Sequence, residues 1–347
     1  MATDHAIPTQ GTIVHELIDQ LKHVIIIQDG TIIKNTVKDD KITIRLEDNQ
    51  TFIKTFESDN PIVSKNQKEA TCRLHIHVPK HHQSPHPLHI FFLQKDTDLK
   101  HNISLEIEAG AFLTYNEYLH AQKDVTIDVV SQALVAHSAT LEYHGIANFD
   151  HNTVSSIHRI ARAHDNARVL YKTAQMGHGN THQDTWINLL GPMAYGEIKT
   201  VALANDAQEA IIKSLIEHSA KHTEGLIEQY GVAADTSFLV FEGVGKIHKG
   251  MKQSHAHQHN KGVVLGPLAR LDANPLLLID EYDVEASHGA AIGRIDEEQL
   301  YYLMSRGLSE KDAQRLIIKG YLAPLETLMK NDDMKEHFQR LLQQKTQ

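Results

Sequence analysis

A short pattern recurs along the middle of the chain at a nearly constant interval, and it restricts the fold more than any other feature. In each copy a small residue is followed by alternating apolar positions, and the first three intervals are 29, 28 and 29 residues. The copies begin at Gly110, Ala139, Ala167 and Gly196, and continue at longer intervals at Ala234 and Ala269. A repeat of this length is typical of solenoids, in which each unit packs only on its neighbours.

Each repeat contains further short strand-like runs, separated by Gly, Asn or Asp. Examples are residues 125–130, 154–160, 186–190 and 262–265. Because no ten-residue helical pattern lies between them, the sequence argues against a doubly wound α/β sheet. It predicts a mainly β protein with a β-solenoid core, most simply a parallel β-helix. Residues 208–218 fit either element, because their apolar spacing is helical while their β-branched residues suit a strand.

The first 70 residues lack the repeat, and we expect an N-terminal helix and a β-hairpin cap region there. Apolar residues at helical spacing predict a short helix after Thr12: Val14, Leu17, Ile18 and Leu21. Asp29-Gly30 joins two strand-like runs, 24–28 and 31–33, as a hairpin turn, and residues 41–46 alternate as a strand. The polar stretch 57–68 is expected to be a surface loop.

The solenoid core is expected to occupy residues 71–290. Near its start, residues 79–89 contain three prolines and four histidines, a composition that fits a solvated loop and could bind metal adventitiously. The single cysteine, Cys72, lies in an alternating strand pattern and is expected to be buried. One cysteine excludes an intramolecular disulfide and an all-cysteine metal or cluster site within this sequence.

Residues 291–347 predict a C-terminal helical domain. We expect one helix from Asp296 to Gly307, a second from Ser309 to Gly320, and a third after Pro324. Their apolar faces would either cap the solenoid or bind a partner, and the candidate partner-binding residues are Leu300, Leu303, Leu316 and Ile317.

Composition excludes several classes of function. The net charge is −10, and no clustered excess of Lys and Arg predicts binding to nucleic acid or to a membrane surface. No apolar run approaches the ~20 residues that span a bilayer, and the N-terminus lacks a secretory signal pattern. We therefore expect a cytoplasmic protein. Nucleophile-elbow, Walker and dinucleotide-binding motifs are also absent from the sequence, so we expect another chain to supply any nucleotide hydrolysis.

Histidine is the compositional anomaly, at 26 residues. His255, His257 and His259 alternate along a predicted strand after His248, so their imidazoles would project from one face and could share a metal ion. This triplet supports an alternative hypothesis, a free-standing metal-dependent β-protein. Histidines also recur late in successive repeats, and could form a structural ladder: His158, His182, His222, His257 and His288.

His288 has the most suggestive surroundings. It follows an apolar strand at 276–279 and lies between small residues in an expected loop, with acids at Asp283 and Glu285 just before it. It is a candidate metal ligand or interface residue, and Glu285 is a possible second ligand.

Three runs around His288 resemble the core signature of the SufB/SufD family of iron–sulfur cluster assembly proteins. They are Leu268-Ala-Arg-Leu-Asp-Ala-Asn-Pro, Asp283-Val-Glu-Ala-Ser-His-Gly-Ala and Ile295-Asp-Glu-Glu-Gln-Leu-Tyr-Tyr-Leu-Met-Ser-Arg-Gly. The Ser-His-Gly-Ala form resembles the SufD branch.

The resemblance implies a right-handed parallel β-helix with flanking helical segments. It also implies a non-enzymatic scaffold subunit that pairs with a SufB-like chain and binds a SufC-like ABC ATPase through the C-terminal helices. His288 would lie at the dimer interface, opposite a partner cysteine, and iron or a nascent cluster would be shared there rather than bound stably by the isolated chain. Some SufD relatives carry a cysteine at the position of Ala286, so any thiol here would come from the partner. A homodimer of the isolated chain is a further expectation.

Overall fold

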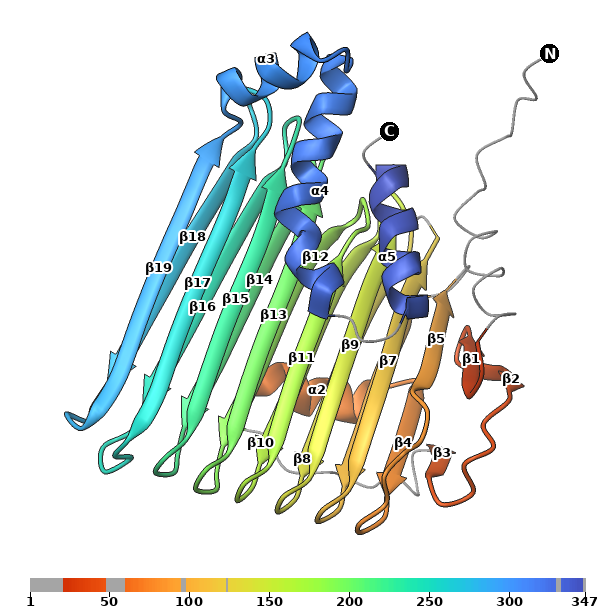
Figure 1. The fold of residues 1–347 in the computed structure, drawn as a ribbon. Helices are drawn as coiled ribbons and strands as arrows, with labels where there is room; N and C mark the ends of the chain where they lie inside the picture. Colours follow the sequence, from red (N-terminus) through yellow and green to blue (C-terminus); the bar gives the residue numbers. More distant parts are fainter. Residues whose placement is uncertain (1–20, 48–59, 95–97, 123, 329–331, 346–347) are drawn as a thin grey trace.

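The computed structural model describes residues 21–47, 60–94, 98–122, 124–328 and 332–345. Within these residues the chain forms a β-solenoid of two stacked sheets, as the repeat predicts (Figure 1). Sheet A, in sequence order, contains β1 (Val24–Gln28), β2 (Thr31–Asn35), β5 (Leu88–Gln94), β7 (Phe112–Ala121), β9 (Thr140–Phe149), β11 (Arg168–Gln175), β13 (Tyr195–Ala204), β15 (Glu224–Ala233), β17 (Ser254–Val264) and β19 (Val284–Arg294).

Sheet B contains the other strands of the solenoid. They are β3 (Thr43–Glu47), β4 (Cys72–Val78), β6 (Leu99–Ile107), β8 (Thr126–Val135), β10 (Val154–Ala163), β12 (Asn180–Leu189), β14 (Glu209–His218), β16 (Phe238–Ile247) and β18 (Arg270–Ile279). From β4 onward, successive strands therefore alternate between the sheets, and each strand pairs in parallel with the strand one turn away. The ambiguous segment 208–218 is a strand, β14, as its β-branched residues favour.

Parallel pairing keeps equivalent residues in register from turn to turn. Phe112 pairs with Thr140, Thr140 with Arg168, and Arg168 with Tyr195, at intervals that match the sequence repeat. Adjacent strands in such a sheet lie about 4.8 Å apart. From β4 onward, residues 26 to 32 apart in sequence are therefore neighbours in space, and this property controls which side chains can meet.

The turns between strands repeatedly use a left-handed backbone conformation. At one end of the strands this residue is Asp124, Asn152, Asp206 or Asp235, with φ between 54° and 63°. Asn and Asp enter this region more readily than other non-glycine residues. The Asn and Asp residues that separate the strand-like runs in the sequence therefore occur where the turns require a left-handed backbone.

The interior contains both apolar and polar side chains, and among them is a buried ion pair. Tyr115, Tyr143 and Tyr171 form a column, with ring centroids 4.8 and 4.9 Å apart. The Arg159 guanidinium lies 2.6 Å from the Glu117 carboxylate, and both side chains are at most 1% exposed. The Tyr143 hydroxyl also donates to Glu117, at 2.6 Å, so the buried carboxylate has two partners.

The N-terminal region confirms some predictions and corrects one. β1 and β2 form the expected antiparallel hairpin, and Cys72 is buried in β4. The predicted helix at 12–20 lies outside the described residues. The predicted surface loop at 57–68 is wrong where it is described, because α2 (Pro61–Glu69) begins at the Asn60 N-cap and packs against β6 and β8.

The sequence signal for α2 was an Asn-Pro pair, since Asn is a favoured N-cap and Pro a favoured first helical residue. The many polar residues of this segment led to the wrong prediction of a surface loop. Gln67 donates to Gln132 at 2.6 Å, and Asn102 donates to Asn66 at 2.9 Å, so polar residues of this helix are buried with hydrogen-bond partners.

The C-terminal region contains three helices, α3 (Glu297–Ser305), α4 (Glu310–Leu328) and α5 (Asp332–Lys345). Asp296 caps α3 as predicted, and Gly307 follows it with φ 95°. The predicted end of the second helix at Gly320 is wrong, because α4 continues through Gly320 and Pro324. One glycine inside a helix costs only about 1 kcal/mol, and burial of Ala313, Ile317 and Ile318 opposes that cost. The third helix therefore begins at Asp332.

Helices cover both faces of the solenoid. Figure 1 shows α4 and α5 in front of sheet A and α2 behind, and α4 contacts β11, β13, β15 and β17. None of the described helices is long and apolar enough to cross a membrane.

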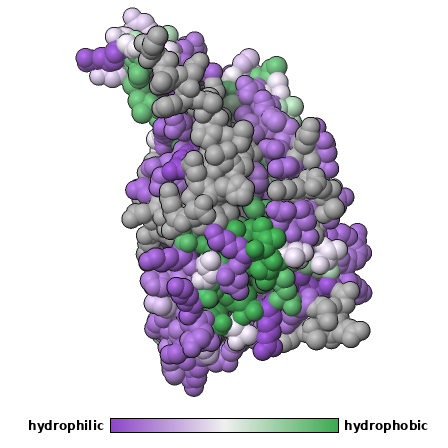
Figure 2. Space-filling view, turned by 90° about the vertical axis from the view of Figure 1, so that its right-hand side faces the viewer, coloured by the Kyte–Doolittle hydropathy of each residue, from purple (hydrophilic) through white to green (hydrophobic). Residues whose placement is uncertain are grey.

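The N-terminal end of the solenoid carries an apolar surface. Figure 2 faces the end that carries β1 and β2, and shows apolar side chains gathered on its lower half. Ile33 of β2 and Leu46 of β3 are 56% and 38% exposed.

Several histidines are buried and neutral, and they predict a pH-dependent stability. Burial lowers the pKa of His101 and His337 to about 3, and mainly burial lowers that of His89 and His218 to about 4. The unfolded chain binds protons near pH 6.5, whereas these folded histidines stay neutral until much lower pH, so stability falls as pH drops from 6.5 toward 4.

We expect the free energy of unfolding to fall by about 1 kcal/mol per buried histidine between pH 7 and pH 5.5, as measured by urea denaturation. His101→Leu should make this fall in the free energy of unfolding smaller by about 1 kcal/mol, the contribution of one buried histidine. The control His259→Leu, at an exposed site, should leave the fall unchanged. Equal slopes in all three proteins would contradict this account.

Candidate functional site at the open end of the solenoid

The last turn of the solenoid leaves both sheets with an open edge. In the described part of the chain, β18 ends sheet B and β19 ends sheet A. Every residue of β19 after Val284 is exposed, and Leu276 and Leu278 of β18 are each 50% exposed. Unpaired edge strands present free backbone N–H and C=O groups to any chain able to pair with them.

His288 lies within β19, so its predicted position in a loop is wrong. It pairs in register with Gln258 of β17. Small neighbours such as Ser287 and Gly289 give the sequence weak strand propensity, but pairing along the whole of β17 overrides it. β19 continues to Arg294, past the expected core limit at residue 290.

The register also defines the direction of the His288 side chain. Gln258 is 1% exposed, and its side-chain amide donates to the backbone oxygen of Leu276 in the opposite sheet, at 2.8 Å. His288 therefore lies on the interior face of sheet A, at the end where no further turn of the described chain covers it. An imidazole in this position is accessible to an ion or a chain that adds to the open end.

Glu285 and His288 lie on opposite faces of β19. Glu285 pairs in register with His255 on the outer face, and its carboxylate lies 3.5 Å from Nδ1 of that histidine. Residues three apart in a strand point to opposite sides. The structure therefore does not bring Glu285 and His288 together as ligands of one metal.

The histidine triplet of β17 is on one face, as predicted, but its members have different neighbours. His255, His257 and Glu285 place one ligand atom each within 4.8 Å of one another. His259 lies exposed beside Gly289 and is not part of this group. Nδ1 of His257 lies 2.7 Å from the Ser287 hydroxyl, which leaves Nε2 of that ring for a metal.

His248, which precedes the triplet in the sequence, contacts Glu217 rather than the triplet. Its Nε2 lies 2.6 Å from the Glu217 carboxylate. The Lys246 ammonium also donates a hydrogen bond to this carboxylate, at 2.8 Å. Burial raises the pKa of Glu217, but these two partners outweigh it and hold the pKa below its ordinary value.

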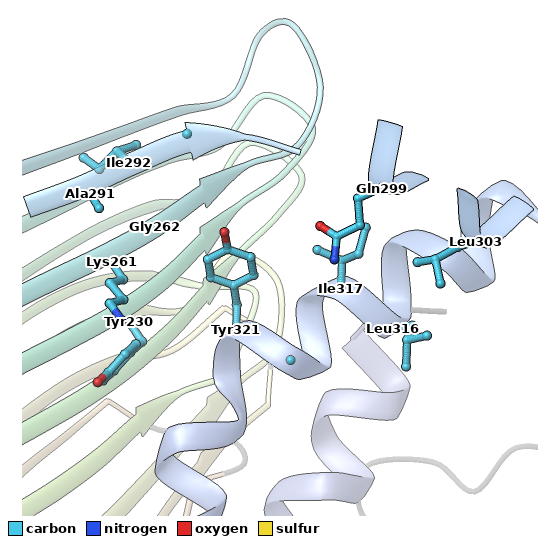
Figure 3. Close-up of a pocket in the computed structure, with 12 residues that line it drawn as sticks. Tyr230, Lys261, Gly262, Ala291, Ile292, Gln299, Leu303, Leu316, Ile317 and Tyr321 are labelled. Atoms are coloured by element: carbon cyan, nitrogen blue, oxygen red, sulfur yellow. The ribbon is translucent and has the colours of Figure 1, made fainter. Parts of the chain in front are cut away.

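Two hollows flank the last turns. A polar hollow of about 660 Å³ lies beside His255, His257 and Glu285, which we call the outer-face group. Its lining includes Glu224, His255, Asp283 and Glu285. A more apolar groove of about 780 Å³ lies between the last strands of sheet A and helices α3 and α4. Figure 3 shows Ala291 and Ile292 on the strand side of the groove, Leu303 and Leu316 on the helix side, and Tyr321 between them.

Comparison with known protein families decides the identity of this fold. Residues 91–321 match the family model described as "SUF system FeS cluster assembly, SufBD core domain". The chain belongs to the SufB/SufD family. It is 33% identical over 277 residues to the iron–sulfur cluster assembly protein SufD of Bacillus subtilis, an alignment that covers 78% of this chain and 63% of the relative.

Other relatives extend the same conclusion. The chain is 25% identical to the SufD protein of Escherichia coli over 67% of this chain and 55% of the relative. It is 27% identical to a SufBD family protein of Pyrococcus horikoshii, over 72% of this chain and 57% of the relative. The chain thus spans somewhat more than half the length of these three curated relatives.

In this SufB/SufD family chain, the four candidate partner-binding residues occupy different environments. Leu300 and Leu303 on α3 are half-buried, Leu316 on α4 is 51% exposed, and Ile317 is only 6% exposed. Leu303, Leu316 and Ile317 line the groove. Ile317 thus packs within the molecule, whereas Leu316 faces outward.

The predicted histidine ladder is limited to one pair. His158 and His182 lie on neighbouring strands and share Asp184, at 3.1 and 3.0 Å. Burial raises the pKa of Asp184, but hydrogen bonds from both histidines outweigh it and hold the pKa well below its ordinary value. His222 lies in a turn, and His257 and His288 are on opposite faces of sheet A.

Sequence reasoning missed a second group of possible metal ligands, His151, His178 and Asp206. The signal was their spacing of 27 and 28 residues, which equals one turn of the solenoid.

The two neighbouring α4 residues give a test of the packing. Ile317→Ala should destabilise the attachment of α4 by roughly 2–4 kcal/mol, because it opens a cavity beneath the helix, while Leu316→Ala should change it by less than about 0.5 kcal/mol. Hydrogen exchange of α4 amides, followed by mass spectrometry, measures both. Equal acceleration of exchange in the two variants would contradict the assigned orientation of α4.

Proposed function

We propose that this chain is a non-catalytic subunit of a Suf-type scaffold for iron–sulfur cluster assembly. In this proposal it pairs with a SufB-like chain, binds a SufC-like ABC ATPase, and presents His288 at the interface to iron or a nascent cluster. One observation carries the proposal: an accessible histidine on the interior face of a terminal strand whose outer edge has no partner strand among the described residues. Family membership and the names of the SufD relatives support it.

The open edge supports pairing with a second solenoid. A partner that adds strands to β18 and β19 would satisfy their free backbone groups and cover Leu276 and Leu278. The same addition would enclose His288 between the two chains. A SufB-like chain is the proposed partner, and two copies of this chain would use the same edge in a homodimer.

The ligand chemistry supports a shared site. A neutral imidazole is a competent iron ligand, but one histidine cannot hold iron or a cluster alone. Cys72 cannot contribute, because it is buried in β4 near the other end of the solenoid, where burial raises the pKa of its thiol to about 12. The thiolates that iron–sulfur clusters prefer would therefore come from the partner, and the cluster is cargo that forms only in the complex.

The groove between sheet A and the helices supports a separate docking surface for the ATPase. Leu303 and Leu316 line it, and Tyr301 and Tyr302 on α3 are 75% and 55% exposed. Exposed aromatic and aliphatic residues around an apolar groove are typical of protein-binding surfaces. This surface includes Ala291 and Ile292 of β19 as well as helix residues, so it lies next to the edge proposed for the other partner.

The main proposal is tested by co-expressing this chain with the SufB-like and ATPase chains of its source, and purifying the complex without oxygen. His288→Ala should leave subunit stoichiometry unchanged and lower the iron content of the complex at least several-fold. His259→Ala, which removes an exposed histidine from the same sheet, is the matched control and should retain wild-type iron. Normal iron and cluster content in the His288→Ala complex would remove His288 from the proposed mechanism.

A second candidate function is metal binding by the isolated chain at His255, His257 and Glu285, which their convergence within 4.8 Å favours. Here the expected result is that His257→Ala lowers the bound Co²⁺ by one equivalent and His259→Ala does not, measured by visible absorption. If His259→Ala loses that equivalent of Co²⁺, the ligands would instead be His255, His257 and His259, as predicted from the sequence.

A further inference from the structure

Three turns in the middle of the solenoid bring together side chains that lie far apart in the sequence. The turns join β9 to β10, β11 to β12, and β13 to β14, and they carry His151, His178 and Asp206 respectively. Val154 pairs with Asn180, and Thr181 with Ala210, so the strands that leave these turns are in register. The three turns therefore stack at one end of the strands, about one strand spacing apart.

The three side chains converge on one another. One ligand atom from each lies within 4.8 Å of the other two. The rings of His151 and His178 have centroids 4.3 Å apart, and Nδ1 of His178 lies 3.1 Å from Oδ2 of Asp206. His151 and Asp206 are exposed and His178 is half-buried, so the group is accessible from solvent.

The backbone around His178 holds its turn close against the preceding turn. A Cβ atom on Gly177 would lie 2.2 Å from the backbone nitrogen of Phe149, and one on Gly179 would lie 2.4 Å from the backbone oxygen of Thr153. The His178 N–H donates to the Phe149 oxygen at 2.7 Å. The two glycines thus allow an approach that any other residue would prevent, and this approach places His178 beside His151.

Asp206 is held by the next turn of the solenoid. Its backbone N–H donates to the Asp235 carboxylate at 3.0 Å, and its backbone oxygen accepts from the N–H of Thr236, also at 3.0 Å. The Asp235 carboxylate also adds negative charge beside the group, which favours a cation. His178 and Asp206 are therefore both positioned by hydrogen bonds of their backbone groups.

We propose that His151, His178 and Asp206 form a surface site for a divalent transition-metal ion of the Zn²⁺ class. Two imidazole nitrogens and one carboxylate oxygen are a donor set that Zn²⁺ uses with a fourth position open to water. Metal–ligand bonds of about 2.0–2.2 Å require ligand atoms roughly 3.3–3.5 Å apart, so the side chains need to close by little more than 1 Å. The bound ion would connect three successive turns.

This site is separate from the open end of the solenoid. It lies on the turns of β9 to β14, whereas His288 and the outer-face group lie on β17 and β19. The inference therefore does not depend on the proposed function, and its test requires only the isolated full-length chain.

The test uses metal-free chain titrated with Zn²⁺ by calorimetry and with Co²⁺ by visible absorption. His151→Ala and His178→Ala should each remove one equivalent of bound metal, and the near-isosteric Asp206→Asn should weaken that equivalent about 10-fold or more. His257→Ala, which disrupts only the outer-face group, is the matched control and should retain it. Circular dichroism confirms that each variant is folded, as expected for substitutions at exposed turns.

Two further readouts are specific to the proposed site. Saturating Zn²⁺ should raise the Tm of the wild-type chain and of His257→Ala more than that of His178→Ala, because only the first two retain the ligands that connect adjacent turns. Binding should also weaken as the pH falls, since protons compete with the metal for both imidazoles. Equal stoichiometry and affinity in wild type and His178→Ala would overturn the site, as would loss of all bound metal in His257→Ala.

Discussion

In-register parallel pairing of strands is the constraint on which the rest of this structure depends. Each turn of about 28 residues returns the chain to the same position one strand spacing further along, so side chains meet their counterparts from neighbouring turns. The tyrosine column of Tyr115, Tyr143 and Tyr171 follows from this register, and so does the hydrogen bond between Thr173 and Thr200, at 2.9 Å. Within these stacked turns, losing either partner of the buried pair of Arg159 and Glu117 would leave an unpaired charge in the interior.

The same regularity means that a solenoid must be terminated, and the two ends of this one differ. At the N-terminal end the parallel pattern stops at antiparallel strands, β2 against β1 and β3 against β4. At the C-terminal end β18 and β19 have open edges, small residues and an accessible histidine on the interior face. This asymmetry directs the proposed function to the C-terminal end. The helices α3 and α4, which follow β19 directly in the sequence, place a second surface next to that edge.

Much of the architecture was predictable from the sequence, because local signals and the long-range repeat agree there. The spacing of strand-like runs, the Asp29-Gly30 turn and the Asp296 cap all correspond to observed elements. The errors arose where tertiary packing outweighs local propensity. His288 is in a strand because β17 pairs with it, α2 is a helix whose buried face is partly polar, and α4 continues through Gly320. The candidate ligands required the register itself: only pairing shows that Glu285, rather than His259, joins His255 and His257, and that it faces away from His288.

The central claim is that a second chain adds to the open edge of this solenoid and encloses His288. Hydrogen exchange of the β19 backbone amides, compared between the isolated chain and its complex with the SufB-like chain, tests this most directly. We predict strong slowing of exchange across residues 284–294 in the complex, because the partner strand would accept hydrogen bonds from amides that are now open. Unchanged exchange in β19, with slowing confined to α3 and α4, would contradict the claim and place the partner on the helices instead.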